Sequence, residues 1–289
     1  MIQDNQTNMV YMANGLSHYE TVCRNLLEAL HREHIHAGFL PYTSSYKHIW
    51  ARDYMPIQLG KKQFLQYRYA PDYLKSYEDY IPQYQTICRE LRLKGKETPL
   101  VIDGGNVVCC GDKVIMTDKV FKENNGIGKK ELIEALENCL QAQVVIIPWD
   151  RYEIFGHSDG MVRWIGGNRV LLNNYAQADP ALRERLLESL APHFVVEELE
   201  YDTPRPGKLS WAYLNFLQVK NRIFVPGLHA MEDPQALRQL QHFYPDCKVI
   251  QVQGCEQLAR DGGALHCVIW NILADVPEWP KEEANQDNP

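Results

Sequence analysis

The chain has 289 residues, 45% of them apolar, and a formal net charge of −7 at pH 7. This apolar content is enough for a sizeable buried core, and the acidic balance argues against a nucleic-acid partner, because no stripe of lysine or arginine is present to contact a phosphate backbone. No run approaches the roughly 18 apolar residues of a membrane span, and the first residues lack the pattern of an export signal, so we expect a cytoplasmic globular protein with no membrane partner.

Amphipathic helices and β-hairpins alternate along the chain. A hairpin is indicated wherever two short apolar runs flank a tight turn, and a helix wherever apolar residues recur every three or four positions. In chain order the main expected elements are a helix over 19–31, hairpins turning at 60–61 and 111–112, a helix over 130–140 followed by a strand over 144–147, a hairpin turning at 166–167, a helix over 180–190, a hairpin turning at 220–221, a helix over 234–243 and a strand over 267–273.

The hairpin turns recur at steps of about 50 to 56 residues, a spacing that indicates one supersecondary unit copied several times. Five such units fit a closed ring better than an open array with exposed sheet edges. The strand over 267–273 begins a fifth unit, whose partner strand is either missing or supplied by the N-terminus. We therefore expect a single domain over 1–289 of class α+β, with residues 278–289 as a solvated polar tail.

Eight cysteines occur in the chain and none has CxxC spacing. This usage predicts reduced thiols rather than a disulfide frame or a zinc site. The cluster of His31, His34 and His36 contains neither a sulfur ligand nor an i, i+4 pair, so we expect no metal there. Nothing in the sequence points to a cofactor.

Each unit is headed by a polar residue, and these heads follow the repeat: Asp53, Asp103, His157, Asn215 and Cys267. In a ring, equivalent positions converge on the axis, so the five side chains are expected to meet in one cleft. Taken singly, each has a structural reading, because aspartate next to glycine commonly forms a turn and most cysteines are small core residues. Because all five stand at the equivalent position of their units, a functional site is the favoured interpretation.

Cys267 follows a Gly-Gly loop and opens an apolar strand, which places its thiol where a ligand can approach. His157 and Asp159 lie two residues apart and would point to the same side of an extended segment. A thiol attacks as the thiolate, and the group that leaves the attacked carbon must receive a proton. Cys267 as nucleophile with His157 as its proton-transfer partner satisfies both needs.

Five motifs in this order resemble the agmatine deiminase and bacterial-type peptidylarginine deiminase family. They are Trp-Ala-Arg-Asp-Tyr-Met-Pro from Trp50, Asp-Gly-Gly-Asn from Asp103, Gly-His-Ser-Asp-Gly from Gly156, Tyr-Leu-Asn-Phe from Tyr213 and Gly-Gly-Ala-Leu-His-Cys from Gly262. The resemblance covers residues from about 45 to 270. It implies the five-bladed α/β propeller, or pentein, fold of the guanidino-modifying enzymes, which agrees with the ring expected from the repeat.

The resemblance also implies a role for each matched residue. Cys267 matches the nucleophile and His157 the general acid and base, while Asp53 and Asp159 match the carboxylates that pair with the guanidinium. Asp103 stands where the family has a glutamate that supports the histidine and the substrate. Two further residues match motif positions near the site: Asn215 and the aromatic Trp50.

Two departures from the family pattern bear on these roles. Asp103 is one methylene shorter than the usual glutamate, which predicts a weaker contact with His157. The chain is also shorter than typical agmatine deiminases, so the loops that set substrate length are expected to be trimmed.

The resemblance implies a small cationic guanidino substrate such as agmatine, hydrolysed through a covalent amidino-thioether with release of ammonia and a ureido product. Three alternatives stay open: an amidinotransferase, a peptidyl-arginine deiminase, and a retired pentein that acts only as a binding protein. The oligomeric state is also open, a homodimer being one candidate.

Overall fold

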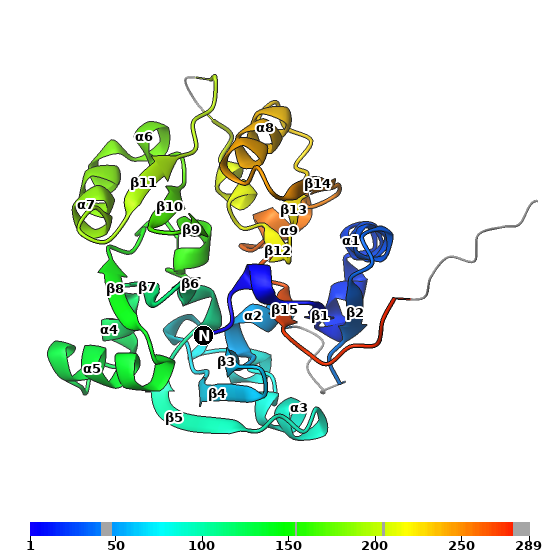
Figure 1. Ribbon diagram of the computed structural model, residues 1–289. Coiled ribbons are helices and arrows are strands. Elements are labelled where there is room, and N and C mark those ends of the chain that lie inside the picture. The colour runs from blue at the N-terminus through cyan, green and yellow to red at the C-terminus, as the bar shows by residue number, and fades with distance from the viewer. Residues whose placement is uncertain (42–47, 154, 204–205, 280–289) are drawn as a thin grey trace, which may run out of the picture.

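The computed structural model describes residues 1–41, 48–153, 155–203 and 206–279. Its strands form five three-stranded sheets, which Figure 1 shows arranged around a common centre in the order of the colour bar. The sheets are β15-β1-β2 (Ile269–Ile272, Met9–Met12, His36–Phe39), β3-β4-β5 (Ile57–Gly60, Gln63–Arg68, Gly95–Val101), β6-β7-β8 (Val108–Cys110, Lys113–Thr117, Gln143–Ile147), β9-β10-β11 (Val162–Gly166, Arg169–Leu172, Val195–Glu198) and β12-β13-β14 (Leu217–Val219, Arg222–Pro226, Lys248–Val252).

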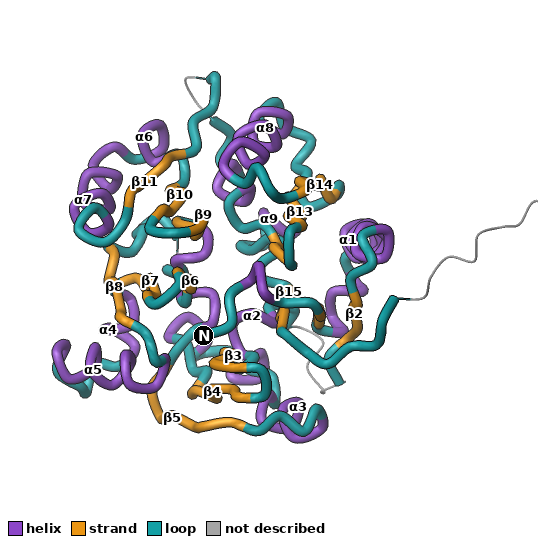
Figure 2. Tube along the Cα trace, in the orientation of Figure 1, coloured by secondary structure: helices purple, strands orange, loops and turns teal. Residues whose placement is uncertain are grey.

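All five sheets share one topology. The first two strands pair antiparallel, and the third pairs parallel with the second. A parallel pair needs a crossover connection, usually a helix. The five crossover helices, which Figure 2 shows on the outside of the ring, are α1 (Glu20–Arg32), α3 (Tyr84–Glu90), α5 (Lys129–Leu140), α7 (Pro180–Leu190) and α8 (Asp233–Phe243).

The two ends of the chain build the fifth sheet together. Strand β1 pairs antiparallel with β15, with Met9 opposite Ile272 and Met12 opposite Ile269. The expected ring of five helix-strand-hairpin units is confirmed, and the missing partner strand is supplied by the N-terminus. This one sheet joins the first unit to the last.

Each crossover helix buries one apolar face against its neighbours, and α1 and α7 contact strands of two adjacent sheets. In α1 the buried positions Val22, Leu26 and Leu30 are spaced by four residues and so form a single stripe. Burying a side chain of this size stabilises the fold by about 1.5–3 kcal/mol. The same pattern in the other units gives three apolar clusters between neighbouring helices and sheets rather than one central core.

A short helical turn lies at the polar head of four units: Asp53 lies within its turn, Asp103 and His157 directly precede theirs, and Asn215 follows two residues after its turn. These turns are α2 (Ala51–Tyr54), η5 (Gly104–Asn106), η6 (Ser158–Gly160) and η7 (Ser210–Tyr213). The expectation that the strands begin at the polar residues was therefore wrong by several residues. The turns close their own hydrogen bonds, as when the Asp103 carbonyl accepts from the Asn106 amide at 2.9 Å, so the polar side chains are displaced from the sheets towards the centre.

The remaining short helices are η1 (Asp4–Gln6), η2 (Asn14–His18), η3 (Asp72–Leu74), η4 (Glu78–Tyr80), α4 (Lys119–Glu123), α6 (Tyr175–Ala178) and α9 (Glu256–Arg260). Within the described ranges, no helix combines the length and the hydropathy needed to cross a membrane. Of the tail expected over 278–289, Glu278 is exposed, whereas Trp279 is half-buried and contacts His34 with a centroid distance of 5.2 Å. Residues 280–289 of that tail lie outside the described residues.

Candidate active site

The structure brings together the polar heads of the five units. His157 lies between two carboxylates, with Nε2 at 3.0 Å from Asp103 Oδ2 and Nδ1 at 3.6 Å from Asp53 Oδ1. The Asn215 side-chain oxygen accepts from the Cys267 amide at 3.3 Å. All five residues are buried.

The imidazole of His157 is held in its charged form. Burial acts to lower the pKa of His157, but the charges of Asp53 and Asp103, the hydrogen bond to Asp103 and the charge of Asp159 outweigh it and raise the pKa to about 10. The expected weakening of the contact with the shorter Asp103 is not found, since 3.0 Å is an ordinary hydrogen-bond length. A protonated imidazole at neutral pH is suited to donate a proton to a leaving amine.

Asp53 approaches the His157 ring at Nδ1, on the side away from Asp103, which contacts Nε2. Burial, opposed by the charge of His157, raises the pKa of Asp53 to about 7. The Gly105 amide donates to Asp53 Oδ1 at 3.2 Å. A Cβ atom on Gly105 would lie 2.6 Å from His157 Nδ1 and 2.7 Å from Asp53 Oδ1, so only glycine fits between the two side chains.

Cys267 lies in a turn two residues ahead of β15, not at the first residue of the strand as expected. Its Sγ is 3.7 Å from Asp159 Oδ2. Burial, with the negative charges of Asp159 and Asp53, raises the pKa of the Cys267 thiol well above its usual value. Cys267 is therefore a thiol at neutral pH, and a positive charge beside it would favour the thiolate.

The segment from His157 to Asp159 is not extended, because Ser158–Gly160 forms the helical turn η6. The reason given for placing His157 and Asp159 together was therefore wrong, although both side chains line the same cavity. Burial acts to raise the pKa of Asp159, but the hydrogen bond and charge of His266, with the charges of His157 and Arg163, lower it below the usual value. Asp159 is thus an anion at neutral pH.

Two cavities open onto Cys267 and His157. The larger, of about 740 Å³, is also lined by Asp159 and Asn215, and the smaller, of about 450 Å³, by Asp53 and Trp50. All the predicted site residues except Asp103 therefore face a cavity. Asp103 lines neither cavity, so its contact with His157 supports that ring rather than a ligand.

Trp50 forms part of the wall of the smaller cavity and is half-buried. A Cβ atom on Gly263 would lie 2.1 Å from its ring, so the indole rests directly on the Gly-Gly loop that precedes Cys267. Gly263 is therefore needed for close packing against the indole ring.

A buried lysine beneath the site was not predicted from the sequence. The Lys119 side chain in α4 is 1% exposed, and its Nζ lies 2.9 Å from Glu123 Oε1, 3.4 Å from Asp72 Oδ1 and 3.7 Å from Asp103 Oδ2. Burial, with the charge of Asp103, raises the pKa of Glu123 to about 8. Lys119 and Glu123 are an i, i+4 pair in a short helix, which in a sequence is indistinguishable from a surface pair.

The histidine cluster of the first unit surrounds an aromatic ring. The rings of His31, His34 and His36 lie 5.1–5.3 Å from that of Trp279, centroid to centroid. Among the described residues, no group of three or more histidine, cysteine or acidic side chains is arranged to hold a metal ion. All eight cysteines are free thiols.

Comparisons with known proteins point to one family. The Porphyromonas-type peptidyl-arginine deiminase family matches residues 1–272. Agmatine deiminase of Pseudomonas fluorescens is 26% identical over 219 residues, which are 63% of this chain and 58% of that protein. Agmatine deiminase of Ectopseudomonas mendocina is 25% identical over 221 residues with the same coverage. The matched region thus spans less than two thirds of the length of these relatives.

Solved structures show the same fold. Agmatine deiminase of Enterococcus faecalis superposes with a TM-score of 0.71 at 17% identity, covering 96% of both chains. The C. jejuni agmatine deiminase gives a TM-score of 0.73 at 17% identity, again covering 96% of both chains. The expected pentein fold is confirmed by these neighbours together with the five sheets.

Proposed function

The chain belongs to the Porphyromonas-type peptidyl-arginine deiminase family, and on this basis we propose that it is a cysteine-dependent hydrolase of guanidinium groups. The observation that carries the proposal is the placement of Cys267 Sγ at 3.7 Å from Asp159 Oδ2, in a cavity that a strongly basic His157 also lines. A cation bound between these groups would lie next to both a nucleophile and a proton donor.

The two carboxylates would hold the guanidinium. Asp53 and Asp159 approach from different units and face the space around Cys267 and His157. Planar guanidinium pairs well with carboxylates through charge-assisted hydrogen bonds. The raised pKa of Asp53 favours its protonated form, and binding of the cation displaces that proton. The cation also stabilises the Cys267 thiolate, because it offsets the two carboxylates that raise the pKa of the Cys267 thiol.

The reaction then proceeds in two halves. With the cation bound, Cys267 releases its proton to solvent and the thiolate adds to the central guanidinium carbon. His157 gives its proton to the departing nitrogen, so that ammonia leaves and an amidino-thioether remains. His157, now neutral, takes a proton from water as the water attacks the same carbon, and cleavage of the carbon–sulfur bond releases a ureido product. Asp103 keeps the imidazole oriented through both halves by accepting from Nε2 at 3.0 Å.

We propose a free, small guanidino compound such as agmatine as the substrate. The curated relatives carry the name agmatine deiminase, whereas the family description names peptidyl-arginine. The second candidate function is amidino transfer, because the same residues would perform it if the substituted amine left first and a second amine replaced water.

The test is product analysis with purified protein. Agmatine, free arginine and a peptide with C-terminal arginine are each incubated with the protein and with a Cys267→Ala control, and ammonia and ureido product are measured. Release from agmatine that is lost in the control is expected. Release from the peptide alone would favour the peptidyl reaction, and a new guanidino compound without ammonia would favour transfer. No reaction with any of the three by the folded protein would contradict the proposal.

A further inference from the structure

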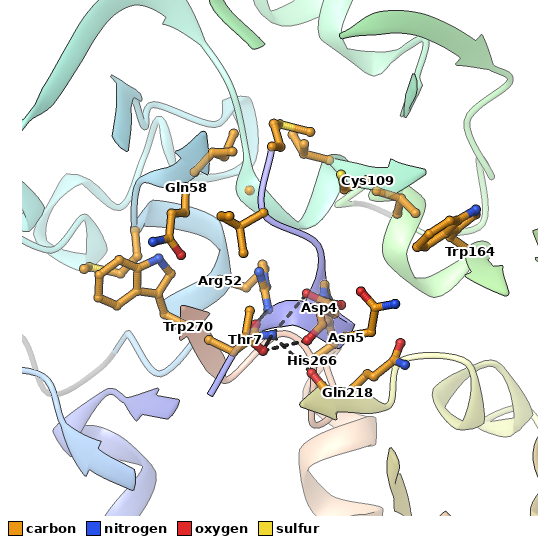
Figure 3. A pocket seen from close by; sticks show the side chains of 18 of the residues that line it. Asp4, Asn5, Thr7, Arg52, Gln58, Cys109, Trp164, Gln218, His266 and Trp270 are labelled. Atoms are coloured by element: carbon orange, nitrogen blue, oxygen red, sulfur yellow. Dashed lines mark hydrogen bonds and ion pairs between the residues drawn. The ribbon is translucent and has the colours of Figure 1, made fainter. Parts of the chain in front are cut away.

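A line of ionisable side chains leads from Cys267 away from the substrate cavities. Asp159 Oδ2, which is 3.7 Å from Cys267 Sγ, is 2.6 Å from His266 Nδ1. The other ring nitrogen of His266, Nε2, is 3.4 Å from Asp4 Oδ2. Asp4 and His266 both line a separate small cavity of about 70 Å³, in which Figure 3 shows them at the N-terminal segment.

Asp4 is firmly held although it lies near the start of the chain. Arg163 Nη2 donates to Asp4 Oδ2 at 2.6 Å, and Asn271 Nδ2 donates to Asp4 Oδ1 at 3.1 Å. Thr7 Oγ1 donates to the Asp4 carbonyl at 2.7 Å and so closes the η1 turn. Burial acts to raise the pKa of Asp4, but Arg163, His266 and Arg52 outweigh it and hold the pKa well below its usual value. The N-terminal segment thus delivers a fixed carboxylate to His266.

His266 lies between the carboxylates of Asp159 and Asp4, one at each ring nitrogen. Burial with the charges of Arg52 and Arg163 lowers the pKa of His266, and a neutral imidazole has a single N–H to donate. The shorter contact places this hydrogen at Nδ1, facing Asp159. The carboxylates of Asp159 and Asp4 oppose this shift and favour the imidazolium, whose second N–H points at Asp4, so the charged ring donates to both carboxylates.

We infer that Asp4 is a positioning residue of the active site, which acts through His266 to hold the Asp159 carboxylate beside Cys267. The inference rests on the proposed function for its effect on substrate, since Asp159 is one of the two proposed guanidinium clamps. It adds one residue of the N-terminal segment, Asp4, to those that shape the site. Asp4 lines neither substrate cavity, so any effect on the substrate is indirect.

A double-mutant cycle separates this role from a merely structural one. The four proteins are the parent chain, Asp4→Ala, His266→Ala and the double variant, with Asn5→Ala as control, because Asn5 is the exposed neighbour of Asp4 in the same turn. KM and kcat are measured with agmatine. The pH midpoint of alkylation of Cys267 by iodoacetamide is measured by mass spectrometry on the tryptic peptide 261–281, in which Cys267 is the sole cysteine.

In the parent background, Asp4→Ala is expected to raise KM about tenfold with a smaller change in kcat, as loss of one charged contact that supports His266 would do. It should also move the alkylation midpoint to lower pH, because an Asp159 that turns away or takes up a proton no longer opposes the thiolate. Both effects should be lost in the His266→Ala background, since residues that act through one another are not additive. Asn5→Ala should match the parent.

Equal effects of Asp4→Ala in both backgrounds, or no effect in either, would overturn the inference. The alkylation readout needs no substrate, so it tests the role of Asp4 even if agmatine is not turned over. If Asp4→Ala fails to fold because Arg163 is left unpaired, Asp4→Asn replaces it, since an amide oxygen still accepts from Arg163. The same loss of effect in the His266→Ala background is then expected, and an unchanged midpoint in the parent background would again overturn the inference.

Discussion

Replacing Asp103 by asparagine tests how the charge state of His157 is set. Asp103 Oδ2 is 3.0 Å from His157 Nε2, and both side chains are buried. A hydrogen bond to a charged group contributes about 1.5–3 kcal/mol, which corresponds to about one to two pKa units. Asp103→Asn should therefore lower the pKa of His157 from about 10 to roughly 8–9.

Asp103→Asn should shift the pH dependence of activity to lower pH. His157 must be protonated to donate to the leaving amine, so the basic limb of kcat/KM should move to lower pH by the same amount. The raised pKa of His157 stabilises the fold fully below pH of about 6.5, and this contribution is lost as the pH rises through about 10. The variant should therefore also be less stable near neutral pH, as measured by urea unfolding.

The direct assay is an NMR titration of the His157 ring in a Cys267→Ala background, with and without Asp103→Asn. Asp72→Asn is the matched control, because Asp72 shares the Lys119 partner of Asp103 but not the contact with His157. His157 should titrate unchanged in the control. An unchanged His157 titration in Asp103→Asn would refute the assigned role of Asp103.

Three further substitutions test other parts of the site. Cys267→Ala should abolish turnover with the melting temperature preserved, and residual activity above background would contradict the assignment of the nucleophile. Gly105→Ala should reduce kcat/KM at least a hundredfold, because a Cβ 2.6 Å from His157 Nδ1 displaces the ring. Gly126→Ala is the control and should leave kcat/KM unchanged, because a Cβ atom there would have no neighbour within 4 Å. Lys119→Met should lower the free energy of unfolding, measured by urea denaturation, by about 3–5 kcal/mol, because it leaves buried carboxylates without their cation. A change below about 1 kcal/mol would show that those carboxylates are protonated.

The ring and most of the site were predictable because both follow the repeat. Five polar residues occupy equivalent positions in the five units, and a ring brings equivalent positions together whatever the local backbone does. These residues are Asp53, Asp103, His157, Asn215 and Cys267. The helical turns beneath these residues were missed, because three-residue segments such as Gly104–Asn106 have no periodicity to detect. The error moved the strand starts without moving the side chains out of the site.

The supporting residues could not be predicted in the same way. Asp4 and Arg163 are 159 positions apart, and nothing in the local sequence of either indicates a partner. Lys119 looks like a solvent-exposed helix residue until the fold places Asp72 and Asp103 on its other sides. His266 precedes the nucleophile in its motif, yet its role depends on Asp159 from a different unit. Charge networks across units are visible only in three dimensions.

The central claim is covalent attack by Cys267 on a guanidinium carbon. The most direct measurement is an acid quench of protein and agmatine during turnover, followed by mass spectrometry of peptide 261–281. Hydrolysis predicts an adduct on Cys267 whose mass is that of agmatine less ammonia. An adduct that carries only the amidino group would mean that the amine leaves first, as in amidino transfer, and turnover with no adduct on Cys267 under any quench time would contradict the covalent mechanism.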